Sequence, residues 1–154
     1  MSHELRFERV FDAAPEEVFD ALTEAEGLEE MYGLDEQGWI LESAGEVRVG
    51  GVWSVAFGPS REELHRFVHT FGVIDRPRRI SYASTQTAPD GSSFDTDVEI
   101  TLEGRDGKTL MTLVEKGFPS AEVRDLHETG TPHAFDRVER FMDARAPGGR
   151  SGLR

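Results

Sequence analysis

The sequence predicts an α+β fold in which a curved antiparallel β-sheet wraps around a long C-terminal helix. Three observations lead to this prediction. A short strand passes directly into a helix that begins with proline, two-residue alternation then continues from about 39 to 118, and one amphipathic helix follows near the C-terminus. A sheet bent around a helix can leave a cavity between the two. The order of the elements therefore predicts a fold that can hold a ligand more clearly than it identifies the ligand.

The first two elements are predicted from local patterns. In 5–11, Leu5 and Phe7 share one face of a strand and charged residues take the other. Pro15 suits the first position of a helix at 15–23, because that position needs no backbone N–H. Two glutamates follow it and favour the positive end of the helix dipole. The chain therefore begins with a strand and a helix.

A second short helix is predicted within 23–31. Leu28 and Met31 would turn inward at helical spacing, although Gly27 interrupts the pattern. A loop follows, and 39–41 begins the next strand. The chain is thus expected to form one strand and then two short helices before the remaining strands of the sheet.

The long alternating stretch predicts a meander of antiparallel strands. We expect 46–49 to reach a hairpin at Gly50-Gly51, because paired glycines favour tight turns. The remaining strands are predicted at about 52–57, 64–74, 80–85, 96–102 and 109–115. In 64–74 the odd positions carry most of the aromatic side chains, so His65, Phe67, His69, Phe71 and Val73 are expected to face inward.

The C-terminal third predicts two helices with a break between them. A short helix is expected at 120–127 and ends before Gly130. Thr131 would cap the final helix and Pro132 would occupy its first position. The apolar face of this helix, which extends to about 144, consists of Phe135, Val138, Phe141 and Met142.

Length and composition limit the class of protein. A chain of 154 residues is expected to form a single domain, which we place at 1–146, with a flexible tail at 147–154. The formal net charge is -13, so this acidic protein is not expected to bind nucleic acid or an anionic membrane surface. Cysteine is absent, which excludes disulfides, thiolate zinc sites and cysteine nucleophiles.

No apolar run approaches the length of a membrane span, and the N-terminus lacks the pattern of a signal peptide. We therefore expect a cytoplasmic protein that does not insert into a membrane. Exposed sheet edges would allow a homodimer. No cofactor is expected.

Three segments, taken together, resemble a known superfamily. They are Phe11 to Thr23, Val49 to Trp53 and Glu115 to Phe118, and the resemblance extends over 3–146. The chain resembles the START-like (Bet v 1-like, SRPBCC) helix-grip superfamily, most closely the branch named for the activator of the heat-shock-protein-90 ATPase. The resemblance implies the helix-grip fold and an internal cavity, but no single chemistry. Ala14 departs from the serine-like cap usual before the first helix, so the first turn is expected to fray.

Side chains on the concave face of the sheet and on the final helix are expected to bind a ligand. An apolar pocket with a few polar groups is the usual form of a small-molecule site. The same aromatic side chains could instead fill the space as a solid core. The predicted ligand-binding residues are Trp53, Val55, Phe57, Phe67, His69, Phe71, Tyr82, Val98, Ile100, Phe135, Val138 and Phe141.

Four polar residues are candidates for proton transfer: His69, His65, Glu115 and Tyr82. His65 and His69 lie four residues apart on one strand, about 13 Å at roughly 3.3 Å per residue, which is too far for one shared metal ion. Glu115 near the cavity mouth would have a raised pKa if it were buried. A structural role remains the alternative for each of the four. His127 and His133 are interpreted as surface or hinge residues.

Three functions are compatible with these patterns. The favoured one is non-enzymatic binding of a small hydrophobic or aromatic molecule. A cyclase- or hydrolase-type enzyme that uses the polar candidates is the second, and the sequence leaves catalysis open. A chaperone-activator-like interaction module, implied by the resemblance alone, is the third.

Overall fold

The computed structural model describes residues 3–33 and 37–145, so the predicted tail at 147–154 lies outside the described residues. Seven strands form one antiparallel sheet in the order β1-β7-β6-β5-β4-β3-β2. The elements are β1 (His3–Phe11), α1 (Pro15–Thr23), α2 (Ala25–Met31), β2 (Ile40–Gly45), β3 (Val52–Gly58), β4 (His65–Asp75), β5 (Arg79–Thr87), β6 (Ser93–Arg105), β7 (Lys108–Phe118) and α3 (Ala121–Arg145).

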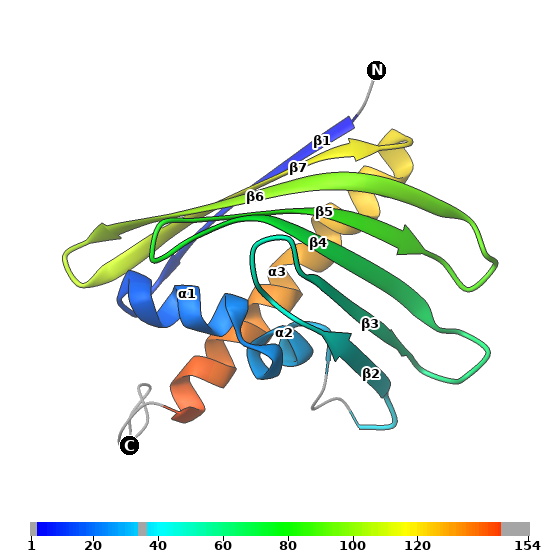
Figure 1. The fold of residues 1–154 in the computed structure, drawn as a ribbon, viewed down its shortest axis with the longest axis horizontal. Coiled ribbons are helices and arrows are strands. Elements are labelled where there is room, and N and C mark those ends of the chain that lie inside the picture. Colours follow the sequence, from blue (N-terminus) through cyan, green and yellow to red (C-terminus); the bar gives the residue numbers. More distant parts are fainter. Residues whose placement is uncertain (1–2, 34–36, 146–154) are drawn as a thin grey trace.

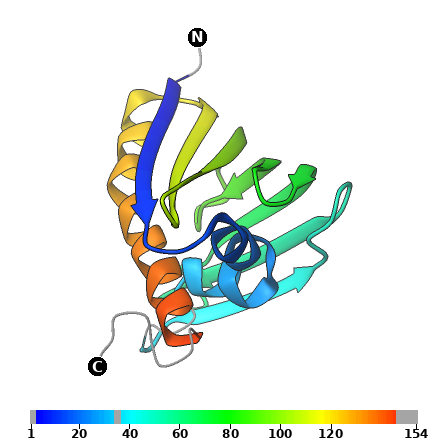
Figure 2. The same cartoon turned by 90° about the vertical axis from the view of Figure 1, so that its left-hand side faces the viewer.

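The predicted fold class is confirmed. The sheet curves over α3, and the short helices α1 and α2 pack beside α3 beneath the same face (Figure 1). The view turned by 90° shows β1 running alongside α3 (Figure 2). The core lies between these layers and includes the largest fully buried side chains of the concave face, such as Trp53, Phe71 and Ile80.

Helix α1 occupies the residues that the local pattern predicts. Pro15 begins it, and Val18, Phe19 and Leu22 are buried. Ala14 at the N-cap provides no side-chain hydrogen bond, as expected from its methyl group.

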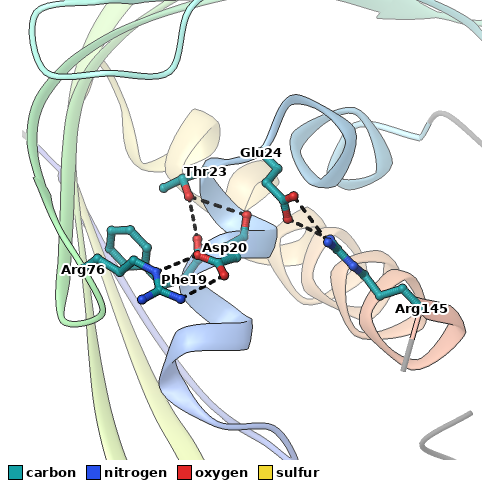
Figure 3. Close-up of polar contacts among 6 residues, drawn as sticks. All are labelled: Phe19, Asp20, Thr23, Glu24, Arg76 and Arg145. Atoms are coloured by element: carbon teal, nitrogen blue, oxygen red, sulfur yellow. Dashed lines mark hydrogen bonds and ion pairs between the residues drawn. The ribbon is translucent and has the colours of Figure 1, made fainter. Parts of the chain in front are cut away.

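Two ion pairs attach α1 and the residue after it to distant elements (Figure 3). Arg76 donates to both carboxylate oxygens of Asp20, at 2.9 and 3.1 Å. Arg145 donates to both oxygens of Glu24, at 2.7 and 3.3 Å, from the C-terminal end of α3. The two pairs therefore join α1 to the β4–β5 turn and to α3.

Helix α2 is confirmed as a short element with Leu28 and Met31 buried. Gly27 stands where α2 crosses close to α1. A Cβ atom built on Gly27 would lie 1.9 Å from the carbonyl oxygen of Ala21. Only glycine permits this approach of the two helices.

The predicted strand at 46–49 and its two-residue hairpin are wrong. Strand β2 ends at Gly45, which has φ of 118° and pairs with Trp53. The backbone at 50–51 pairs with β4 instead, because the N–H of Gly50 donates to the carbonyl of Phe71 at 2.8 Å and the Phe71 N–H donates to Gly51 at 3.0 Å. The glycines thus end a six-residue connection between β2 and β3 and lie beside Phe71 of β4.

Strand β4 changes its inward face at a bulge, so the prediction that Val73 faces inward is wrong. The register with β5 shifts between Phe71 and Val73. After the bulge, Ile74 pairs with the buried Ile80 and packs against the core, whereas the N–H of Val73 bonds the Ser81 hydroxyl oxygen at 3.1 Å. One extra residue in a strand reverses which side chains face the core.

The predicted break near Gly130 is also wrong, because α3 is one continuous helix with Pro132 inside it. Thr131 does not cap a new helix, since its hydroxyl donates back to the carbonyl of His127 at 2.6 Å. Proline inside a helix removes a backbone hydrogen bond. Burial of Phe135, Val138 and Met142 in the core offsets that cost, which the local pattern does not reveal.

Candidate functional site

A cavity of about 400 Å³ lies between the concave face of the sheet and α3. Its wall is formed mainly by aromatic and aliphatic side chains, with a smaller set of polar ones among them. Three lining residues are themselves exposed, His65, Leu126 and Gly130, and they mark the mouth. This combination of an apolar wall and a few polar groups is typical of a small-molecule site.

The structure divides the twelve predicted ligand-binding residues into three groups. Those that line the cavity are Phe57, Phe67, His69, Tyr82, Val98 and Phe135. Trp53, Val55, Phe71, Ile100 and Val138 belong to the buried core instead. Phe141 lies farther along α3, where the guanidinium of Arg145 covers its ring at 4.9 Å.

His69 is buried against the aromatic wall. Its ring lies 4.4 Å from the ring of Tyr82 and stacks on Trp53 at 5.9 Å, measured between centroids. The Nε2 atom is 2.8 Å from the hydroxyl of Tyr32, whereas Nδ1 has no hydrogen-bond partner. Burial lowers the pKa of His69 to about 4, so the ring is neutral at physiological pH.

The two phenols beside His69 also remain protonated. Burial raises the pKa of Tyr82, and the negative charge of Glu115 raises it further. Burial likewise raises the pKa of Tyr32 well above its ordinary value. This part of the cavity is therefore uncharged at neutral pH.

Glu115 lies at the other polar part of the wall and is only 7% exposed. Its Oε2 atom accepts a hydrogen bond from the Thr96 hydroxyl at 2.7 Å and another from the Gln86 amide at 3.1 Å. Burial raises the pKa of Glu115, while Thr96, the charge of His127 and Gln86 oppose that rise. The predicted raised pKa is thus present, and its cause is burial.

Gln86 connects Glu115 to His127. The Oε1 atom of Gln86 lies 2.7 Å from Nε2 of His127, and Nδ1 of that ring lies 3.1 Å from the carbonyl oxygen of Val123. Both ring nitrogens therefore lie within hydrogen-bond distance of an oxygen atom. The amide of Gln86 therefore bridges a carboxylate and an imidazole across the cavity wall.

The interpretation of His127 as a surface or hinge residue is wrong. Its ring lines the cavity and packs 4.8 Å from the ring of Phe118. The continuous course of α3 places it there, so a prediction of two helices could not find it. His133 is exposed, as expected.

Gln86, Ser84 and Thr96 were not among the predicted site residues. Two of these residues could have been predicted from alternation along β5. The inward positions of this strand are even-numbered and include Ile80, Ser84 and Gln86. Polar residues at positions that otherwise face a core indicate a site. Tyr32 had no such signal, because it lies in a turn after α2.

Metal ligation is not favoured by the part of the chain that the structure describes. It holds no cluster of three or more histidine, aspartate or glutamate side chains suited to a metal ion. His65 lies exposed at the mouth, whereas His69 is buried deeper in the wall.

In 3–33 and 37–145, no helix combines the length and the hydropathy needed to cross a bilayer.

The fold and its cavity define the class of protein: a START-like (SRPBCC-type) helix-grip domain with a chamber under the C-terminal helix. Residues 12–143 match the family described as Activator of Hsp90 ATPase homolog 1-like protein, and the chain belongs to that family. No curated protein matches the chain.

Solved structures share the fold at low sequence identity. A putative uncharacterized protein from Rhizobium leguminosarum superposes with a TM-score of 0.80 at 19% identity, covering 94% of this chain and 97% of that one. The Mll3558 protein from Rhizobium loti gives 0.78 at 20% identity, with 90% and 96% covered. A protein from Chromobacterium violaceum gives 0.76 at 22% identity, again with 90% and 96% covered. These similarities show the fold alone.

Proposed function

We propose that this protein binds a small, mainly apolar or aromatic molecule in the cavity and does not transform it. The observation that carries the proposal is the aromatic chamber of about 400 Å³, which has buried polar groups at two places in its wall. Space of this size in a protein of 154 residues is large compared with ordinary packing voids.

Burial of apolar ligand surface would supply most of the binding free energy. At about 25 cal/mol per Å², a ligand that buries about 300 Å² gains about 7.5 kcal/mol before the costs of association. The neutral His69 and the phenols of Tyr32 and Tyr82 would orient such a molecule without a charge to desolvate.

The test is a titration with N-phenyl-1-naphthylamine, a neutral probe whose fluorescence rises in apolar surroundings. We expect saturable binding and a higher melting temperature with the probe present. Absence of both effects would contradict the proposal.

A cavity-filling variant locates the binding site. Ala134 borders the cavity from α3, so Ala134→Phe should weaken probe binding at least about tenfold by occupying the space. Ala121→Phe places the same ring on an exposed position of the same helix and should bind the probe as the wild type does. Equal affinity in the two variants would show that the probe binds elsewhere.

A further inference from the structure

Glu115 has one oxygen that its neighbours do not use. Oε2 accepts both available donors, from Thr96 and Gln86, while Oε1 makes no hydrogen bond among the described residues. The residue borders the cavity and is 7% exposed, and Oε1 is not among the fully buried unpaired atoms. A carboxylate oxygen that is accessible from the cavity and receives no donor from the protein indicates where a ligand donor would bind.

Tyr82 offers a second unused group on the same wall. It lines the cavity, and its hydroxyl makes no hydrogen bond with any residue that the structure describes. Tyr82 pairs with Val98 across β5 and β6, and Val98 pairs with Glu115 across β6 and β7, so the three form one row across the sheet. The charge of Glu115 also acts on Tyr82, which places the two groups in one electrostatic environment.

We propose that the cavity selects an aromatic molecule bearing a neutral hydroxyl group, which donates to Oε1 of Glu115 and accepts from the Tyr82 phenol, and that it rejects the corresponding carboxylate. The proposal rests on the binding function proposed above and adds the polar group of the ligand. A hydroxyl supplies both a donor and an acceptor, whereas a carboxylate supplies acceptors alone.

Charge repulsion by Glu115 adds to the preference for the neutral hydroxyl ligand over the carboxylate. A ligand carboxylate would bring a second negative charge close to Glu115 in surroundings of low polarity. The basic side chains that face this wall already contact other protein groups. His127 contacts Gln86 and the Val123 carbonyl, and Arg137 donates to the carbonyl of Met31 at 3.2 Å.

The experiment measures displacement of N-phenyl-1-naphthylamine at pH 8 by naphthalene, 2-naphthol and 2-naphthoate. These three compounds share one ring system and differ in the polar group. We expect 2-naphthol to bind about tenfold or more tightly than naphthalene, as one hydrogen bond to a charged group allows, and 2-naphthoate to bind more weakly than naphthalene.

Two variants assign the selectivity to the proposed groups. In Glu115→Gln the amide oxygen would take over the bonds from Thr96 and Gln86, so the amide NH₂ would replace Oε1 and turn an acceptor into a donor. We expect 2-naphthoate to gain affinity and the preference for 2-naphthol to disappear. Tyr82→Phe should weaken 2-naphthol severalfold and leave naphthalene unchanged, and it serves as the test if Glu115→Gln does not fold.

The matched control is Glu99→Gln, which changes the net charge equally at an exposed residue of β6 that pairs with Arg79. It should keep the wild-type selectivity. Equal affinities for naphthalene and 2-naphthol, or an unchanged preference in both Glu115→Gln and Tyr82→Phe, would overturn the inference while leaving the binding function intact. If neither naphthalene nor 2-naphthol displaces the probe, both are overturned.

Discussion

The hydroxyl of Tyr32 lies 2.8 Å from Nε2 of His69, which joins the turn after α2 to the middle of β4. The partners are 37 residues apart, and the imidazole is 2% exposed. This contact holds one end of the helical layer against the concave face of the sheet, and it places a neutral imidazole in the cavity wall.

The first prediction concerns acid stability. Burial lowers the pKa of His69 from 6.5 to about 4, so between these values the unfolded chain binds a proton that the native protein does not. The stabilisation is complete above pH 6.5 and is lost as the pH falls towards 4, by about 3 kcal/mol. Urea unfolding of wild type and His69→Gln from pH 7.5 to 4 should show a shallower loss in the variant. Parallel curves would rule out His69 as the cause.

Glu115 should make the free energy of unfolding change with pH in the opposite direction. Burial raises the pKa of Glu115 above its ordinary value of 4.5, so the native protein binds the proton more tightly than the unfolded chain. That contribution is present below pH 4.5 and is lost as the pH rises through the native pKa. The stability of Glu115→Gln relative to wild type should therefore increase from pH 4 to pH 8. A constant difference across this range would contradict the prediction, with Glu99→Gln as the control for net charge.

Gly27→Ala should strongly destabilise the protein. Its Cβ would meet the backbone oxygen of Ala21 at 1.9 Å, and a backbone atom cannot move aside without displacing α1 from α2. We expect a loss of about 3 kcal/mol or more in the free energy of unfolding. A loss below about 1 kcal/mol, measured by urea unfolding, would show that the two helices can separate at little cost.

Gly130→Ala is the matched substitution and should stabilise the protein. Gly130 lies in α3, is exposed, and has nothing within 4 Å of the position that a Cβ would take. Alanine reduces the conformational freedom of the unfolded chain and favours the helix, so the gain should be about 0.5–1 kcal/mol. A decrease in melting temperature would instead indicate that α3 needs glycine at this position.

Local signals were enough to predict several elements from the sequence. Helix α1 begins at Pro15 and ends at Thr23 as predicted, because the proline and the apolar stripe act within the helix itself. The aromatic residues of the concave face could also be identified, since alternation along one strand is a local property. Alternation failed at Val73, where the register shift in β4 reverses the facing of the residues that follow.

The break predicted at Gly130 and Pro132 shows the limit of local rules. Both residues disfavour a helix on their own, yet α3 continues through them because Phe135 and Val138 are buried in the core. The same continuity turns His127 towards the cavity. The wrongly predicted helix break therefore also led to the wrong placement of this site residue.

By itself the sequence determined the fold class, the acidic character of the chain and the aromatic face that lines the cavity, because composition and periodicity are properties of neighbouring residues. The tertiary structure alone decided how the polar groups meet. Gln86 and His127 are 41 residues apart, and Gln86 and Glu115 are 29 apart. Their contacts depend on sheet curvature, strand register and the course of α3, which are set by packing across the whole domain.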